Sequence, residues 1–132
     1  PIDVVCSKDF DNESERKTFD ITKIDNDFQG MDAGPKSLEL FEKVVMDSKT
    51  ILWNGPLGVF EFSNFSNGTK MLGDFISKST KQGAFSLVGG GDSVAAVKKF
   101  KIENKMSYVS TGGGAMLESL EGKDLPGINA LL

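Results

Sequence analysis

Apolar and polar positions follow two different periods that alternate along the chain. Short β-branched or alternating runs predict strands, and runs with apolar residues every three or four positions predict helices. The strands expected are Ile2–Ser7, Phe19–Ile24, Thr50–Trp53, Ala84–Val88 and Met106–Ser110. The helices expected are Pro35 to about Met46, Gly68 or Thr69 to Gly83, Asp92 or Ser93 to about Phe100, and Gly113–Leu120. This alternation predicts an α/β fold in which helices flank a parallel sheet.

The segments between these elements are polar or rich in turn residues. Charged flanks place the strand Phe19–Ile24 at an edge, and Asp25–Gly34 is predicted to be a loop. The carboxylates of that loop could bind a metal, but their spacing is not that of an EF-hand, which favours a solvated loop. Near the end of the chain, Leu125-Pro126-Gly127 predicts an extended exit, and the apolar tail Ile128–Leu132 is expected to pack on a surface, either of this chain or of a part that it lacks.

A triple-glycine turn carries the clearest chemical signal. Gly89, Gly90 and Gly91 follow a short apolar strand and precede a helix. Glycines let backbone N–H groups approach an anion without interference from Cβ. The start of a helix adds unpaired N–H donors and the positive end of the dipole, which together make a phosphate site. The sequence is neither a Walker loop nor GxGxxG, so a simple tight turn is the alternative.

The same arrangement recurs at Gly112, Gly113 and Gly114, and Gly112 follows Gly89 by 23 positions. That spacing allows a strand, a helix and a return strand, so the two strands are expected to be parallel and adjacent. Both glycine turns would then lie at the carboxyl edge of the sheet, where open α/β sheets bind ligands. Two neighbouring anion sites indicate more than one phosphate, or one phosphate in transit.

One loop and two single residues each leave two interpretations open. The loop Asn54–Glu61 follows a buried strand and contains Gly-Pro-x-Gly, which fits either a ligand contact or a connection that packs into the core. Asp92 and Ser93 are good N-cap residues. Alternatively, Asp92 would hold Mg²⁺ and Ser93 would donate to a phosphate. Thr111 is expected to cap the helix after the second turn.

Composition limits the class of protein. The 132 residues fit one domain, and the net charge of −4 argues against a partner that is a nucleic acid or an anionic membrane. The single cysteine excludes an internal disulfide and indicates a reduced compartment. No apolar run approaches the roughly 18 residues of a membrane-spanning helix. The chain begins with Pro-Ile-Asp-Val-Val, already inside an expected strand, so we expect it to start within a domain.

Four motifs in this order resemble the phosphoglycerate kinase family. They are Trp53-Asn54-Gly55-Pro56-Leu57-Gly58-Val59-Phe60-Glu61, Gly89-Gly90-Gly91-Asp92-Ser93, Ser110-Thr111-Gly112-Gly113-Gly114-Ala115, and Glu121-Gly122-Lys123-x-Leu125-Pro126-Gly127. The resemblance covers residues 1–132 as the second half of a Rossmann-like, three-layer nucleotide-binding domain. Residues 125–132 would return to an amino-terminal domain that this chain lacks.

The resemblance also implies roles for individual residues. Gly30, Met31, Gly58 and Val59 would line the adenine pocket. The other nucleotide contacts would be Asn54, Pro56 and the ribose acceptor Glu61. The phosphate loop would comprise Gly89, Gly90, Gly91, Asp92 and Ser93, with Asp92 as the Mg²⁺ ligand. Gly91, Gly112, Gly113 and Gly114 would act on the phosphoryl group in transfer.

The family is a cytoplasmic, glycolytic transferase that moves a phosphoryl group between 1,3-bisphosphoglycerate and ADP, giving 3-phosphoglycerate and ATP, with Mg²⁺. The resemblance implies ADP/ATP and phosphoglycerate as ligands and a monomeric parent protein. Because the family's substrate-binding arginines would lie before Pro1, we expect this chain alone to be inactive. The alternatives are a non-catalytic nucleotide-binding module, an NAD-dependent oxidoreductase, which the missing GxGxxG disfavours, and a purely structural α/β domain.

Overall fold

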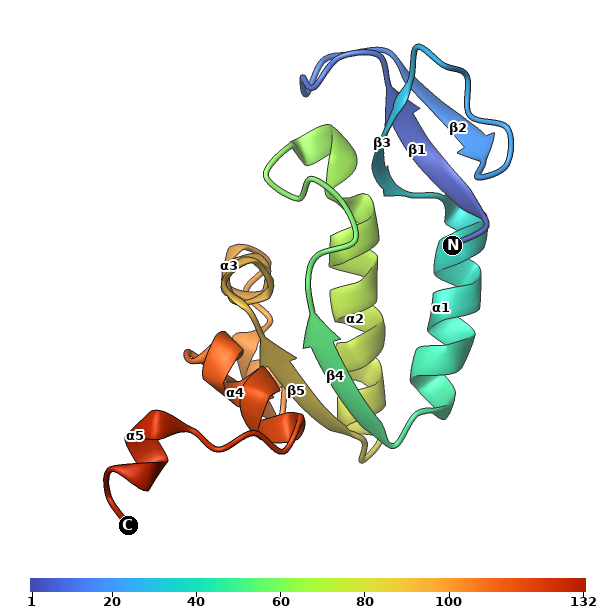
Figure 1. Cartoon of the computed structure of the whole chain (residues 1–132). Helices are drawn as coiled ribbons and strands as arrows, with labels where there is room; N and C mark the ends of the chain where they lie inside the picture. Colours follow the sequence, from blue (N-terminus) through green and yellow to red (C-terminus); the bar gives the residue numbers. More distant parts are fainter.

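The computed structural model describes all 132 residues and arranges them around two three-stranded sheets (Figure 1). The strands are β1 (Asp3–Ser7), β2 (Arg16–Asp20), β3 (Gln29–Ala33), β4 (Thr50–Asn54), β5 (Phe85–Gly89) and β6 (Tyr108–Val109). The α-helices are α1 (Pro35–Asp47), α2 (Asn67–Lys81), α3 (Gly91–Lys99), α4 (Gly113–Leu120) and α5 (Pro126–Asn129). Two 3₁₀ turns, η1 (Ser63–Phe65) and η2 (Glu103–Lys105), complete the order.

The sheet that contains β4, β5 and β6 is parallel and confirms the α/β prediction. Its strand order is β4-β5-β6, with α2 connecting the first pair and α3 the second. The strands before the two glycine turns are therefore adjacent and parallel, as their spacing predicts. β6 is shorter than expected, although Ser110 N–H still donates to Val88 O at 2.8 Å. All three strands end at one edge.

Helices cover both faces of this sheet. In Figure 1, α2 lies behind β4 and α4 lies in front of β5. The core cluster combines residues of β4, β5, α2, α3 and the segments next to them: Ile51, Trp53, Ile76, Ala84, Val88, Val97, Ile102 and Met106. This three-layer arrangement fixes the ends of β4 and β5 in space, which is where the glycine turns begin.

The other sheet is antiparallel, with the order β2-β1-β3, and the periodicity of the sequence did not predict it. The prediction that Asp25–Gly34 is a loop was wrong for β3. This segment, Gln-Gly-Met-Asp-Ala, has little intrinsic strand preference and is a strand because it pairs with β1. The prediction of a strand over Phe19–Ile24 was displaced: β2 is an edge strand, as expected, but it ends at Asp20.

Two buried carboxylates connect the antiparallel sheet to the helices. Asp3 of β1 accepts hydrogen bonds from the N–H groups of Lys36 and Ser37, at 3.0 and 2.7 Å, in the first turn of α1. Asp32 of β3 accepts a hydrogen bond at 2.8 Å from the N–H of Gly68 in the first turn of α2. Each carboxylate thus satisfies unpaired donors at a helix N-terminus, and together they fix the sheet to both helices.

The environment of Asp3 predicts that the protein loses stability at acidic pH. Burial alone would raise the pKa of Asp3, but hydrogen bonds from Ser37 and Lys36 outweigh it and hold this pKa below 3.8. Its stabilisation is therefore complete above the unfolded value and is lost as pH falls through the lower folded value. We expect Asp3→Asn to lower the free energy of unfolding by about 1 kcal/mol at pH 7, in the range of lost helix caps.

Urea unfolding of both proteins at pH 7 and at pH 3 measures this effect. The difference between wild type and Asp3→Asn should shrink at the lower pH. An equal difference at the two pH values would show that the charge of Asp3 contributes nothing. The contributions of the other titrating groups cancel in this difference, because both proteins contain the same groups.

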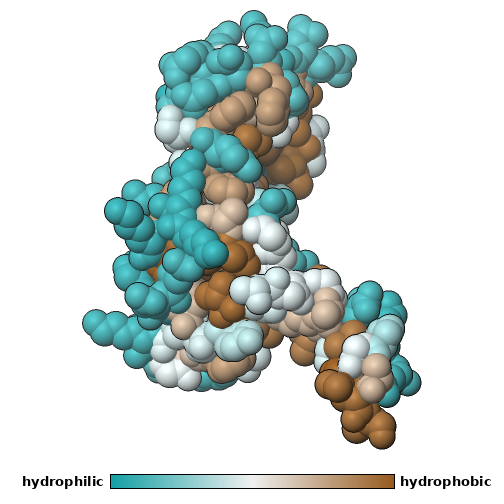
Figure 2. Space-filling model, turned by 90° about the vertical axis from the view of Figure 1, so that its left-hand side faces the viewer, coloured by the Kyte–Doolittle hydropathy of each residue, from teal (hydrophilic) through white to brown (hydrophobic).

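The end of the chain differs from its prediction. The expected extended exit at Leu125-Pro126-Gly127 is instead the start of α5, since Pro126 occupies the first helical turn. Within this chain the tail leaves Leu131 87% exposed and Leu132 fully exposed, so its packing on a part outside this chain stays a prediction. Figure 2 shows this tail as a brown, apolar projection at the lower right. None of the helices combines the length and apolar character needed to cross a membrane.

Candidate functional site

The two triple-glycine turns lie in direct contact. A Cβ atom added to Gly113 would lie 2.3 Å from Gly90 N and 2.7 Å from Gly90 Cα. Such distances are below any real contact, so only glycine allows the turns to approach this closely. Gly90 itself has φ +86°, a backbone conformation that favours glycine. On the same turn, a Cβ at Gly89 would lie 2.1 Å from Met116 Cε of α4.

The turns present two sets of unpaired backbone donors. The first intrahelical bond at α3 is Val94 N–H to Gly90 O, and the first at α4 is Met116 N–H to Gly112 O. The amides before these bonds donate to no acceptor of the chain; they belong to Gly91, Asp92, Ser93, Gly113, Gly114 and Ala115. Six free donors at two helix starts form a region suited to more than one phosphate group.

The prediction that Thr111 caps α4 was wrong, and the N-cap interpretation of Asp92 and Ser93 does not hold. The N-cap residues are Gly90 and Gly112, and neither helix has a side-chain cap hydrogen bond. Asp92 and Ser93 lie inside the first turn of α3, and Thr111 precedes the N-cap of α4. Because each helix begins directly at its glycines, the free amides are not covered by a capping side chain.

Ser93 and Asn54 connect the first glycine turn to the loop after β4. Ser93 is fully buried, and its hydroxyl accepts a hydrogen bond of 2.6 Å from Gly55 N–H. That hydroxyl therefore holds the Asn54–Glu61 loop, and the Ser93 amide is the group left free. Asn54 Oδ1 would lie 2.6 Å from a Cβ on Gly90, so the amide of Asn54 faces the turn.

Asp92 is the carboxylate nearest to these donors along the chain. It is exposed at the second position of α3. No group of three or more histidine, cysteine or acidic side chains gathers anywhere in the structure. The protein therefore offers one carboxylate at this position, which fits an ion such as Mg²⁺ that takes its other ligands from phosphates and water.

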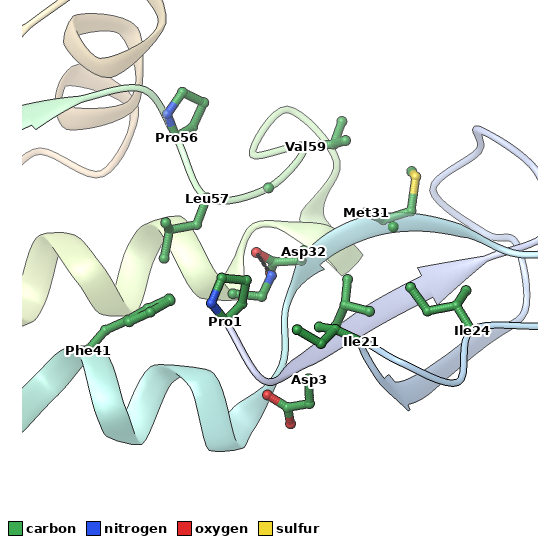
Figure 3. Close-up of a pocket in the computed structure, with 14 residues that line it drawn as sticks. Pro1, Asp3, Ile21, Ile24, Met31, Asp32, Phe41, Pro56, Leu57 and Val59 are labelled. Atoms are coloured by element: carbon green, nitrogen blue, oxygen red, sulfur yellow. Dashed lines mark hydrogen bonds between the residues drawn. The ribbon is translucent and has the colours of Figure 1, made fainter.

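A pocket of about 450 Å³ lies between the antiparallel sheet and the loop after β4 (Figure 3). Its lining is mainly apolar and includes five residues predicted as nucleotide contacts: Gly30, Met31, Pro56, Gly58 and Val59. Val59 N–H donates to Met31 O at 2.9 Å, which fixes the loop to β3. The structure thus brings together residues that are about thirty positions apart in the sequence.

One part of the Asn54–Glu61 loop lines the pocket and another part packs into the protein. Gly58 and Val59 line the pocket, whereas Phe60 is buried in the protein. The ammonium group of Lys99 donates to the backbone carbonyls of Phe60, at 2.7 Å, and Glu61, at 3.1 Å. Glu61 does not line the pocket, and its side chain is exposed.

Several residues of the pocket were not singled out from the sequence: Pro1, Asp3, Val4, Ile21, Ile24, Asp32, Ala33, Phe41 and Leu57. Figure 3 shows Ile21 and Ile24 coming from the segment after β2, on the side opposite Leu57. Asp32 offered no signal beyond its two apolar neighbours, Met31 and Ala33, because the rest of its segment suits a loop. Ile21 and Ile24 offered none, because their position depends on the pairing of β2 with β1.

Comparisons with known proteins give one consistent result. The family model described as phosphoglycerate kinase matches residues 1–123. The chain is 57% identical over 130 residues to a phosphoglycerate kinase of Porphyromonas gingivalis, covering 98% of this chain and 31% of that protein. It is 50% identical to a phosphoglycerate kinase of Candida albicans, covering 99% of this chain and 32% of that protein.

Solved structures agree with these sequence matches. A phosphoglycerate kinase from Coxiella burnetii superposes with a TM-score of 0.90 at 43% identity, covering 98% of this chain and 33% of that one. A phosphoglycerate kinase from Pyrococcus horikoshii superposes with a TM-score of 0.81 at 36% identity, covering 99% of this chain and 31% of that one. The chain thus spans about a third of the length of the relatives that it matches.

Proposed function

Because this chain belongs to the phosphoglycerate kinase family, we propose that its two glycine turns bind the phosphates of ADP or ATP. The proposed enzyme transfers a phosphoryl group from 1,3-bisphosphoglycerate to ADP, giving ATP and 3-phosphoglycerate. This chain would contribute the nucleotide and phosphate loops. The observation that carries the proposal is the contact between Gly90 and Gly113, which places six unpaired amides at one edge of the sheet.

The pocket supports a nucleobase site, and the loop Asn54–Glu61 connects it to these amides, because Pro56–Val59 line the pocket and Gly55 N–H donates to Ser93 Oγ. Its apolar walls offer contact to both faces of a flat ring, as small-molecule sites commonly do. Gly30, Met31, Gly58 and Val59 would contact the adenine. Asn54, Pro56 and Glu61 would contact the rest of the nucleoside, with Glu61 accepting the ribose hydroxyls. The phosphates would then extend along Gly89–Ser93.

The charge of the phosphates calls for a cation, and the exposed Asp92 fits one. We assign Asp92 as the single carboxylate that would hold Mg²⁺, in a reaction where the ion neutralises charge on the phosphates. The free amides of Gly91, Asp92 and Ser93 would hold and orient the phosphate chain. The requirement of phosphoryl transfer is chiefly positioning and electrostatic stabilisation, which backbone donors can supply.

The second set of amides would receive the group in transfer. Gly112, Gly113 and Gly114 would form this second site, and because Gly113 lies against Gly90, a phosphoryl group could move between two helix starts over a short path. Gly91 would act from the donor side of that path. The phosphoglycerate would be held by the amino-terminal part of the whole enzyme, a cytoplasmic and monomeric protein in this proposal.

Binding of MgADP tests the assignment directly. Trp53 is buried, and its Nε1 donates to Gly55 O at 2.8 Å, so its fluorescence reports on the Asn54–Glu61 loop. We expect saturable quenching by MgADP, and Asp92→Ala should weaken binding about tenfold, which corresponds to about 1.4 kcal/mol. The control is Asp47→Ala, an exposed aspartate at the end of α1, which should bind as wild type does.

Two results would contradict the assignment. One is an unchanged affinity in Asp92→Ala. The other is quenching by NAD as strong as that by MgADP, since the proposed pocket and amides are arranged for a mononucleotide with adjacent phosphates.

We also expect this chain alone to give no turnover of 1,3-bisphosphoglycerate. Arg16 is the only arginine in the sequence, so the chain cannot supply the several substrate-binding arginines that the resemblance implies. A coupled ATP-production assay on the purified polypeptide measures this. Turnover that co-purifies with the 14.2 kDa chain would refute the expectation.

A further inference from the structure

A second hollow of about 630 Å³ lies away from the glycine turns. It is formed by one side of α2 from Met71 to the end of the helix, by η2 and by the residue after η2, with nine lining residues: Met71, Asp74, Ser77, Lys78, Thr80, Lys81, Asn104, Lys105 and Met106. The end of α2 precedes β5, and η2 precedes β6. The hollow is therefore at the amino edge of the parallel sheet, opposite the edge that carries the free amides.

The charge of this hollow differs from that of the chain. Three lysines and one aspartate line it, whereas the whole chain carries a net charge of −4. Lys81 and Lys105 take part in no ion pair, and Lys78 is 4.0 Å from Glu42 Oε1, at the outer limit of a contact. Two ammonium groups from separate elements thus remain without a carboxylate partner at the same opening.

The two methionines that form the floor of the hollow, and the two hydroxyl groups in its lining, limit what it could bind. Met71 and Met106 supply an apolar surface, and Met106 is only 8% exposed. The hydroxyls of Ser77 and Thr80 donate to the carbonyls of Gly73 and Ile76, both at 2.7 Å. The donors left for a ligand are the lysine ammonium groups and the amide of Asn104.

Lysines near the end of a helix often serve only to complement its dipole. That explanation covers Lys78 and Lys81, which lie in the last turn of α2. Lys105 also ends a helix, but η2 has only three residues and therefore little dipole to complement, and the explanation does not account for the methionine floor between the two elements. A flexible methionine surface under a cationic opening suits a ligand with an apolar body and an anionic group.

We propose that this hollow binds a small organic phosphate. Its phosphate meets Lys81 and Lys105, and its apolar body lies on Met71 and Met106. The volume is within the range of small-molecule sites, about 300–1,000 Å³. This site is separate from the proposed nucleotide site and does not depend on it.

The probe for the test is 1-naphthyl phosphate, titrated into the ¹⁵N-labelled full chain. Two reference probes separate its parts: 1-naphthol has the apolar body without charge, and inorganic phosphate has the charge without the body. We expect 1-naphthyl phosphate to shift the amide signals of residues 77–81 and 104–106 and to bind at least tenfold more tightly than either reference. Binding should weaken as salt is raised.

The matched variants remove the same charge at two places. Lys81→Gln with Lys105→Gln should weaken 1-naphthyl phosphate at least fivefold. Lys43→Gln with Lys123→Gln, whose lysines pair with Glu39 and Glu121 elsewhere, should bind as wild type does. Equal weakening in both double variants would overturn the proposal. So would tight binding of 1-naphthol or of inorganic phosphate, or shifts confined to residues 91–93 and 113–115, which belong to the nucleotide site.

Discussion

Gly113→Ala is expected to lower the free energy of unfolding by about 2 kcal/mol, in the range of overpacked sites, and to weaken MgADP binding at least tenfold. Its new Cβ would lie 2.3 Å from Gly90 N, so the two glycine turns must separate. The neighbouring atoms are backbone and cannot rotate away as a side chain would. The free amides of α3 and α4 would then no longer share one site.

Gly114→Ala is the matched control. It is the next residue of α4, and a Cβ there meets nothing within 4 Å. Alanine in a helix is favoured over glycine by about 1 kcal/mol, so this variant should be as stable as wild type or more stable. Urea unfolding of both variants measures the contrast in stability, and MgADP titration of Gly113→Ala against wild type measures the loss of binding. If Gly113→Ala behaves like Gly114→Ala, the turns are not packed as described.

Asp32→Ala is expected to cost about 3 kcal/mol, the upper range for losing hydrogen bonds to a charged group. Asp32 is 4% exposed, and its carboxylate accepts from Gly68 N–H and from Ala33 N–H, each at 2.8 Å. Removal leaves the first turn of α2 without its acceptor and opens space beside the pocket. Asp27→Ala, at an exposed position of the same segment, should change stability by less than about 0.5 kcal/mol.

Asp32→Asn separates the charge from the hydrogen bonds. Burial raises the pKa of Asp32 above 3.8, against the opposing effect of the hydrogen bonds from Gly68 and Ala33. The folded protein therefore binds this proton more readily than the unfolded chain, and wild type loses stability as pH rises from 3.8 through the folded value. The stability contributed by a neutral asparagine does not depend on pH, and its side chain keeps one acceptor oxygen. We therefore expect Asp32→Asn to lower the free energy of unfolding by only about 1 kcal/mol at pH 7.

Chemical unfolding of wild type and Asp32→Asn across pH 3.5–7 tests the sign. As pH falls, the free energy of unfolding of wild type should rise relative to that of Asp32→Asn. In the Asp3→Asn comparison, wild type should instead lose stability relative to the variant as pH falls. If the free energy of unfolding of wild type instead rises relative to that of Asp32→Asn as pH rises, the assigned direction of the pKa shift is contradicted.

The parallel half of the fold could be predicted from the sequence because its signals are local. Each strand before a glycine turn is apolar, each helix after it has a clear period, and a spacing of 23 residues leaves room for only one crossover. The contact between Gly90 and Gly113 follows from adjacent strands that end at one edge. The clustering of Gly58 and Val59 with Gly30 and Met31 came from family resemblance, not from periodicity.

The antiparallel half could not be predicted because its determinants are not local. β3 has a sequence that suits a loop, and its strand conformation depends on hydrogen bonds to β1, some 25 residues earlier. The roles of Asp3 and Asp32 were hidden for the same reason, since each caps a helix that begins more than thirty residues away along the chain. The neighbours of such a carboxylate along the chain do not show which helix N-terminus the fold places beside it.

The most direct test of the proposed nucleotide site is a map of backbone amide shifts in the ¹⁵N-labelled chain as MgADP is added. The account predicts that the largest shifts fall on residues 91–93 and 113–115, with a second group at Gly30, Met31, Gly58 and Val59, and that adenosine shifts only the second group. Shifts from MgADP that avoid residues 91–93, or a spectrum that MgADP leaves unchanged, would contradict the claim that the paired glycine turns form a phosphate site.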